Sequence, residues 1–261
     1  DMTVSTPKHP ARAVCAVFLA ALAVPALAEH PLITDDAGTQ GKGKAQLELV
    51  AEYARAEDAG VVEKTLVGPT MPVLSIGLRD DVDVVSGISY QRTTVEDAGF
   101  RVTQSGAADF ALDVKWRFYE RAGLGLALKP GLTLPTGDHE KGLGAGKSTQ
   151  RLFAIATQEA GPWAFHANVG FTRNANRAGD REALWHASAA AARVAVKDLK
   201  ATANVGVDTN PDPSSRRMPA YVLGGLVYAV SESLALDVGA RRSFNVSGTA
   251  YAVLAGMTIR L

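Results

Sequence analysis

Cysteine is almost absent from this chain of 261 residues, which contains only Cys15. That cysteine stands near the start of the uncharged stretch 13–28, so the sequence beyond it has no thiol and disulfides have no part in its fold. No segment after residue 28 has 18 consecutive apolar residues, which excludes a membrane-spanning helix there. The five histidines show no metal-ligand spacing. We therefore expect neither a metal site nor a cofactor.

A strong net charge is also lacking. Lys8 and Arg12 precede the apolar stretch 13–28, which ends in Ala-Leu-Ala. This pattern predicts a secretory signal peptide at residues 1–28, cleaved before Glu29. Without it, 25 basic residues stand against 26 acidic ones. A balance this close to zero argues against nucleic acid as a partner.

From residue 44 onward, apolar and polar residues alternate with a period of two. In segment 106–119, Val114, Trp116 and Phe118 share one face, whereas Asp113 and Lys115 share the other. Segment 249–261 shows the same alternation up to the last residue. Twelve such segments follow one another. Because only lipid accepts a closed ring of apolar faces, residues 44–261 predict an all-β, up-and-down antiparallel transmembrane β-barrel of 12 strands.

The connections between these segments alternate in length. Tight turns such as 79–81 and 197–198 alternate with longer polar links at 56–63, 93–105, 136–149, 174–182, 209–219 and 243–248. Outer-membrane barrels have short periplasmic turns and longer extracellular loops. We therefore predict a protein of the Gram-negative outer membrane, exported and cleaved. Its partners would be the membrane lipid and the barrel-assembly machinery, which would recognise the C-terminal strand.

Two strands do not show which face meets lipid. These are the alanine-rich segment 183–196 and segment 220–230. Most of the tyrosines and tryptophans lie near predicted strand ends, which favours the aromatic girdles found at membrane interfaces. Tyr119 is the one aromatic that the alternation places clearly inside.

Short motifs along residues 29–261 resemble a known family. They are Pro31-Leu32, Thr34-Asp35-Asp36-Ala37, Gly41-Lys42-Gly43, Gln46-Leu47-Glu48, Lys115-Trp116-Arg117-Phe118 and Leu134-Pro135-Thr136-Gly137-Asp138. The chain resembles the outer-membrane family named for the meta-pathway of phenol degradation, whose members are described as transporters. The resemblance implies a barrel that acts as a channel for small, aromatic or hydrophobic solutes.

The predicted inner face carries charges of both signs. The lumen-lining candidates are Glu48, Glu52, Asp109, Asp113, Lys115, Arg117, Lys129, His166, Asn168, Lys200, Asp237 and Arg241. A twelve-stranded lumen is intermediate between a filled barrel and an open channel. These charges would therefore either line a narrow pore or pair and fill the lumen. The predicted function is a channel or facilitator for small solutes, and the alternative is a lumen-filled structural barrel.

His186 and Ser188 raise a third possibility, a barrel lipid hydrolase. They lie two residues apart, on one face of a strand, as the His-x-Ser pair of lipid A deacylases does. A hydroxyl nucleophile needs a base and an orienting group, and the sequence assigns no acidic residue to orient His186. We therefore expect no enzyme and no catalytic residues.

Residues 29–43 precede the first strand and are too irregular to span the membrane. We interpret them as a periplasmic N-terminal segment that either is a spacer or folds into the barrel mouth. Asp35 and Asp36 would then dock against basic inner-face residues such as Arg117 or Arg260. In that case Asp35, Asp36 and Arg260 are candidates for gating.

Overall fold

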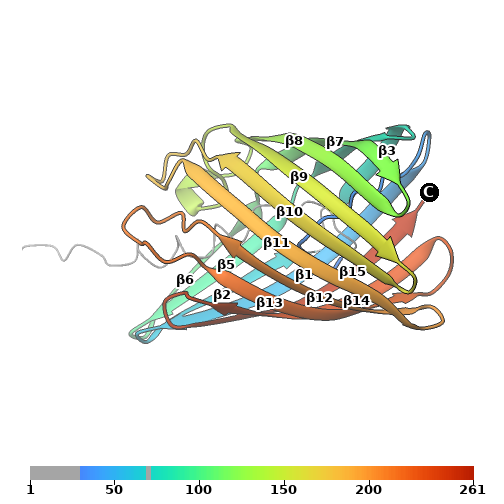
Figure 1. Ribbon diagram of the computed structural model, residues 1–261. Helices are drawn as coiled ribbons and strands as arrows, with labels where there is room; N and C mark the ends of the chain where they lie inside the picture. Colours follow the sequence, from blue (N-terminus) through green and yellow to red (C-terminus); the bar gives the residue numbers. More distant parts are fainter. Residues whose placement is uncertain (1–29, 69–71) are drawn as a thin grey trace, which may run out of the picture.

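The chain folds into one closed, antiparallel β-barrel, seen in a computed structural model that describes residues 30–68 and 72–261. Figure 1 shows the tilted strands and the C-terminus at one end. The predicted signal peptide, 1–28, lies outside the described residues. The strands are β1 (Ala45–Asp58), β2 (Val61–Gly68), β3 (Val73–Arg79), β4 (Val82–Gly87), β5 (Tyr90–Asp97), β6 (Phe100–Ala107), β7 (Phe110–Arg121), β8 (Leu124–Leu134), β9 (Thr149–Ala160), β10 (Trp163–Arg173), β11 (Ala183–Val196), β12 (Leu199–Asp208), β13 (Ala220–Ala229), β14 (Leu234–Phe244) and β15 (Thr249–Arg260).

Fifteen labelled strands make twelve passages of the wall, as predicted. β2 with β3 and β4 with β5 correspond to one predicted strand each, with a short break between the two parts. β7 corresponds to the predicted strand 106–119, and β6, which precedes it in the same passage, lies mostly in the predicted link 93–105. Pro72 is the last residue of the first of these breaks, directly before β3, and it has no N–H to donate to the ladder. The barrel closes where β1 pairs with β15 from Gln46↔Arg260 to Glu57↔Thr249. A twelve-stranded closed barrel is therefore confirmed.

The two ends of the barrel differ. The turn end carries the C-terminus and the short turns 80–81, 122–123, 161–162, 197–198 and 230–233. The loop end carries the longer connections 135–148, 174–182, 209–219 and 245–248. Within 135–148 lies one turn of 3₁₀ helix, η3 (His139–Lys141), capped by the Asp138 side chain. No helix among the described residues is long and apolar enough to span a membrane.

Two of the predicted long links are wrong. The β1–β2 and β5–β6 connections at the loop end are the two-residue turns Ala59-Gly60 and Ala98-Gly99. Both residues of each turn have positive φ, between 45° and 87°, the backbone of a tight hairpin turn that matches strand twist. The strands therefore run on through residues that the sequence analysis assigned to loops. These hairpins project beyond the barrel rim at its lower left (Figure 1).

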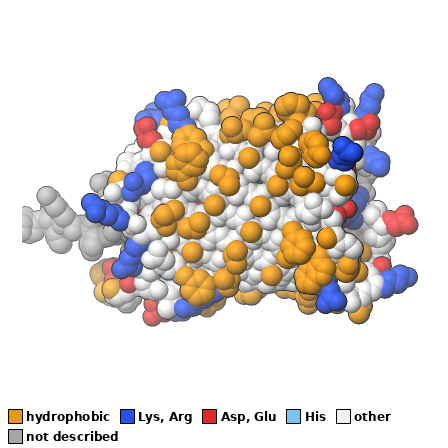
Figure 2. All heavy atoms as spheres, viewed as in Figure 1, with side chains coloured by type: hydrophobic (Ala, Val, Ile, Leu, Met, Phe, Trp, Pro, Cys, Tyr) orange, Lys and Arg blue, Asp and Glu red, His pale blue; other side chains and the backbone are white. Residues whose placement is uncertain are grey.

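The outward faces are apolar, as the alternation predicts. Val114, Trp116 and Phe118 are each about two-fifths to one-half exposed, whereas Asp113 and Lys115 on the same strand are buried. Figure 2 shows hydrophobic side chains spread over the barrel wall, with Lys, Arg, Asp and Glu gathered at its two ends. This apolar belt is the surface that meets lipid.

The structure also decides the two strands that the sequence left open. On β11 the inner face holds His186 and Ser188, and on β13 it holds Tyr221 and Leu223. Tyr221 is therefore a lumenal residue and not part of a girdle. Tyr119, predicted inside, is 42% exposed, because a register shift between Arg117 and Tyr119 interrupts the alternation.

Candidate functional site inside the barrel lumen

Residues 30–43, here the lumenal segment, cross the inside of the barrel. Thr34 and Asp35 are fully buried, and Leu32 and Ala37 are nearly so. The segment forms no strand, so its backbone groups need partners other than a β-ladder. Those partners are side chains of the surrounding barrel, and they attach the segment to several strands at once.

Two asparagines bind the middle of the segment. The Asn204 side-chain oxygen accepts from the backbone N–H groups of Ile33 (2.7 Å) and Thr34 (3.0 Å), and its amide donates to the Thr34 hydroxyl at 2.6 Å. Asn168 accepts from the Asp35 N–H at 2.6 Å and donates to the Asp35 carbonyl at 2.8 Å. Asparagine is uncommon in strands. This is the sequence signal that could have identified Asn204 as a functional residue, although it is not among the predicted lumen-lining residues.

Residues 37–42, the last part of the lumenal segment, are bound nearer the turn end of the barrel. The Ala37 N–H donates to the Thr157 hydroxyl at 2.9 Å, and the Gln40 N–H donates to Asp83 at 2.9 Å. Further on, the Lys42 N–H donates to Asp80 at 3.0 Å. The chain then enters β1.

Asp35 is the electrostatic centre of the site. Its two carboxylate oxygens accept from the Lys115 ammonium at 2.8 Å and the Lys129 ammonium at 2.9 Å. Lys115 also donates to the backbone carbonyls of Asp36 (2.9 Å) and Gly38 (3.2 Å). All three charged side chains are at most 6% exposed. Buried charges are tolerated when they are paired and hydrogen-bonded, and these three charges are paired with one another.

Asp36 and the predicted basic partners behave differently. The Asp36 carboxylate is partly exposed, accepts from the Gly38 N–H and lies 4.0 Å from Lys115. Arg117 donates to the Asp80 carbonyl and pairs with Glu120, and Arg260 donates to the Glu232 carbonyl. Docking to Arg117 or Arg260 is therefore wrong in its partners. Lys115, two residues before Arg117 on β7, and Lys129 on β8 pair with Asp35 instead.

Other predicted lumenal residues form ion pairs and hydrogen bonds with one another, with neighbouring strands or with a loop. Asp113 accepts two hydrogen bonds from Arg151, at 2.7 and 2.6 Å, and Glu52 pairs with Arg241. Asp109 accepts from the backbone N–H groups of Gly137 and Ala145, both at 2.8 Å, and so holds the loop 135–148. His166 is hydrogen-bonded to the Thr157 hydroxyl at 2.9 Å. The lumen thus contains fixed ion pairs and hydrogen bonds.

Two cavities lie on either side of the lumenal segment. The loop-end cavity has a volume of about 230 Å³, and its apolar lining includes Leu143, Phe153 and Leu184. Asp180, in the loop above it, has its pKa raised by burial, with the nearby Asp212 charge adding to the effect. This cavity opens toward the longer loops.

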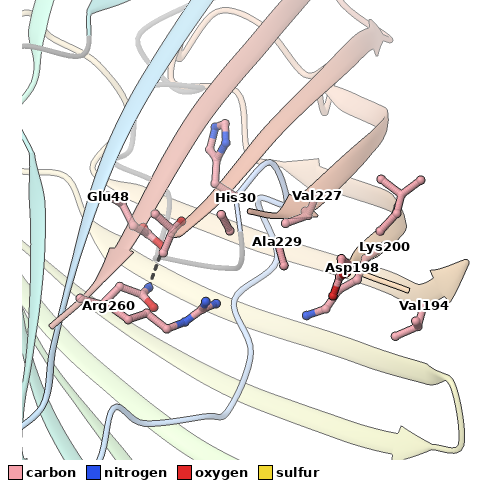
Figure 3. A pocket seen from close by; sticks show the side chains of 12 residues that line it. His30, Glu48, Val194, Asp198, Lys200, Val227, Ala229 and Arg260 are labelled. Atoms are coloured by element: carbon pink, nitrogen blue, oxygen red, sulfur yellow. Dashed lines mark hydrogen bonds between the residues drawn. The ribbon is translucent and has the colours of Figure 1, made fainter. Parts of the chain in front are cut away.

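The turn-end cavity has a volume of about 170 Å³. Figure 3 shows His30 and Glu48 at one side of it and Lys200 and Arg260 among its lining residues. His30 pairs with Asp237, whereas its second ring nitrogen has no hydrogen-bond partner among the described residues. Gln46 donates to one oxygen of Glu48 at 2.9 Å, and the other oxygen is likewise unpartnered. Two buried polar atoms beside this cavity thus lack a hydrogen-bond partner among the described residues.

Neither cavity contains a metal centre. Among the described residues, no group of three or more histidine, cysteine or acidic side chains is arranged to hold a metal ion. The lining of the lumen is one of hydrogen bonds, ion pairs and apolar surface. The chemistry that it supports directly is the binding and passage of small molecules.

Comparison with known proteins gives a family and a fold. The sequence model of the family described as "Putative MetA-pathway of phenol degradation" matches residues 28–261. No curated protein matches the chain.

Solved structures are similar in fold. An outer membrane channel of Pseudomonas putida F1 is 14% identical, with a TM-score of 0.68 over 87% of this chain and 98% of that one. The beta domain of the Bordetella autotransporter BrkA is 12% identical, with a TM-score of 0.55 over 84% and 100%. The translocator domain of the autotransporter NalP from Neisseria meningitidis is 9% identical, with a TM-score of 0.54 over 85% and 89%.

Proposed function

The chain belongs to the family described as "Putative MetA-pathway of phenol degradation", and from that premise we propose that it is an outer-membrane channel for small apolar or aromatic solutes. The observation that carries the proposal is the pair of cavities inside a closed barrel, separated by a segment that contains no strand. In the observed state the lumenal segment closes the path. Its release would join the two cavities.

The cavity linings support a small apolar solute. Phe153 and Leu184 line the loop-end cavity, and Leu199 and Val227 line the turn-end cavity. Ligand sites combine such apolar surface with a few polar groups that fix orientation. The polar side chains of His30 and Glu48, which line the turn-end cavity, supply those groups. An aromatic solute that carries a hydroxyl group meets both requirements.

The cellular setting is part of the proposal. The signal peptide at 1–28 directs export, the apolar belt meets outer-membrane lipid, and the final strand β15 engages the barrel-assembly machinery. The turn end then faces the periplasm and the loop end faces outward, as in other outer-membrane barrels. The lumenal segment joins β1 at this turn end.

Uptake by liposomes tests the channel. Vesicles that contain the refolded protein should take up toluene or phenol faster than protein-free vesicles. In planar bilayers the protein should carry a measurable current. Toluene crosses lipid unaided, so its uptake should be measured into vesicles with a lipopolysaccharide outer leaflet. Equal rates with and without protein, for both solutes, would contradict the channel.

Narrowing the turn-end cavity gives a more local test. Ala229 lines this cavity (Figure 3), so Ala229→Phe should fill part of it and slow phenol uptake severalfold. Ala201 on the neighbouring strand points outward, and Ala201→Phe is the matched control, expected to leave uptake unchanged. Initial rates of uptake at one protein-to-lipid ratio decide the comparison. Equal slowing by both variants would show that the cavity is not on the path.

A lumen-filled structural barrel remains the second candidate. The ion pairs Asp113–Arg151 and Glu52–Arg241 favour it, because they fill lumenal space between fixed walls. A structural barrel should carry no current even after the lumenal segment is released. The single-channel conductance of Asp35→Asn therefore separates the two.

A further inference from the structure

Three polar side chains form a continuous hydrogen-bonded chain on the inner face of β11 and β12. The His186 Nε2 lies 2.8 Å from the Ser188 hydroxyl, and its Nδ1 lies 2.7 Å from Asp208 Oδ1. His186 and Asp208 are direct cross-strand partners, and Ser188 is two residues further along the same face. The strand register therefore supplies the acidic residue that the sequence could not assign.

This order of contacts fixes the tautomer of the ring. The Asp208 carboxylate accepts a hydrogen bond from Nδ1–H, which leaves Nε2 free to accept from the Ser188 hydroxyl. A hydroxyl on Nε2 with a carboxylate on Nδ1 is the arrangement that makes serine a nucleophile. The lumen contains an internal contrast, because His166 also contacts a hydroxyl, that of Thr157, but pairs with no carboxylate among the described residues.

A hydrogen-bond donor lies beside the serine. Gly206 is the residue directly opposite Ser188, and the Tyr221 ring lies over it: a methyl group built on Gly206 would be 2.5 Å from the tyrosine hydroxyl. That hydroxyl is buried, within reach of the Ser188 and Asn204 side chains. A fixed hydroxyl donor next to a nucleophile is placed to stabilise an oxyanion.

The loop-end cavity reaches His186 and Asp208, and Ser188 lies behind His186, next to the cavity. His186 and Asp208 both line the cavity, and the Phe153 ring lies 5.7 Å from the imidazole. Leu143 and Leu184 add apolar surface. Because the three side chains face the lumen, membrane lipid does not reach them, which excludes the lipid deacylase considered from the sequence. A substrate has to be small and has to enter through the loops.

We propose that Ser188, His186 and Asp208 hydrolyse small carboxylic esters with an apolar acyl or aryl group. The Ser188 oxygen bonds to the carbonyl carbon while its proton passes to His186 Nε2. The ester C–O bond then breaks, and the alcohol leaves with that proton. Water attacks the acyl-serine, gives a proton to His186, and the acid leaves as the proton returns to Ser188. Asp208 is a positioning residue, and Tyr221 donates to the oxyanion.

Covalent labelling of the refolded full-length protein tests the nucleophile. A fluorophosphonate probe should label Ser188, identified by peptide mass spectrometry, and heat-denatured protein should not react. Ser188→Ala should lose both the label and the hydrolysis of p-nitrophenyl acetate. Thr202→Ala removes another buried lumenal hydroxyl and should keep both. An unlabelled Ser188, or equal hydrolysis by Ser188→Ala, would overturn the proposal.

Two further variants distinguish chemistry from folding. Asp208→Asn should lower kcat roughly 10²- to 10⁴-fold with little change in KM, because the ring loses its orientation. Tyr221→Phe should lower kcat and leave the fluorophosphonate-reactive serine in place. Ser188→Ala should leave channel conductance unchanged, so failure of the esterase and failure of the channel give different results. Unchanged kcat in Asp208→Asn would contradict the role of the carboxylate.

Discussion

Asp35→Asn should open the barrel. The substitution removes the carboxylate that bridges Lys115 and Lys129, and leaves the two buried ammonium groups with only the more distant Asp36 carboxylate, 4.0 Å from Lys115. Breaking a buried ion pair by removing one partner costs about 3 to 5 kcal/mol. Release of the lumenal segment relieves that cost, because water then reaches both lysines. The ratio of released to docked segment should rise roughly 10²- to 10³-fold, since about 1.4 kcal/mol corresponds to a factor of ten.

Single-channel recording measures the effect. Asp35→Asn should show a larger and more frequent open state than the parent protein. Asp36→Asn is the matched control, because its carboxylate is partly exposed and lies 4.0 Å from Lys115. It should change conductance little, and salt should weaken what change there is.

Two outcomes would contradict this account of gating. Equal conductance in the parent and in Asp35→Asn, with both correctly folded, would mean that the lumenal segment does not control the path. Equal increases in Asp35→Asn and Asp36→Asn would mean that the buried lysine pair is not what holds it. Deletion of residues 29–39 should give the same open state as Asp35→Asn if docking is the gate.

Val169→Arg should prevent or strongly weaken insertion. Val169 is near the middle of β10, faces outward and is 56% exposed on the apolar belt. An arginine on the lipid face costs about 2 to 4 kcal/mol at the bilayer midplane and about 0 to 1 kcal/mol near the interface. Val230, just past the end of β13 at the turn end, is 48% exposed. Val230→Arg is therefore the same substitution at a shallower depth.

Folding into lipid vesicles measures both variants. The heat-modifiable, β-rich species should form with Val230→Arg and fall sharply with Val169→Arg, and urea titration gives the difference in free energy of unfolding. A similar cost for both variants would show that Val169 does not lie deeper in the membrane than Val230. Recovery of the parent as a water-soluble monomer would contradict a membrane barrel altogether.

The effect of a substitution at Ala127 depends on its contacts as well as on the side of the wall that it faces. Ala127 faces inward, as the alternation in β8 predicts, and an inner position of a wide lumen would accept a long polar side chain. The structure packs Ala127 against Ala37 of the lumenal segment and Ile155, at 1% exposure. Ala127→Arg should therefore displace the segment and raise conductance, with the barrel itself intact. Unchanged conductance in a folded Ala127→Arg would contradict this contact.

The sequence by itself determined the barrel. A period of two, with apolar residues on one face and charges on the other, leaves lipid outside and closure as the only way to pair every backbone group. The same alternation placed Asp113, Lys115 and Lys129 inside. It held along strands whose two faces differ strongly in polarity, except at Tyr119, where a register shift interrupts β7. It gave no answer for β11, where Ala187, Ala189 and Ala191 offer little contrast with the opposite face.

Only the tertiary structure decided which lumenal groups meet. Asp35 lies 80 residues from Lys115 and 94 from Lys129, so their contact depends on the curvature of the wall around an irregular segment. Asp208 joins His186 through cross-strand register, which a one-residue slip would undo. Local alternation specifies the side of the wall on which a residue lies. The position around the ring and the depth along the axis come from register and closure, and these set the chemistry of the lumen.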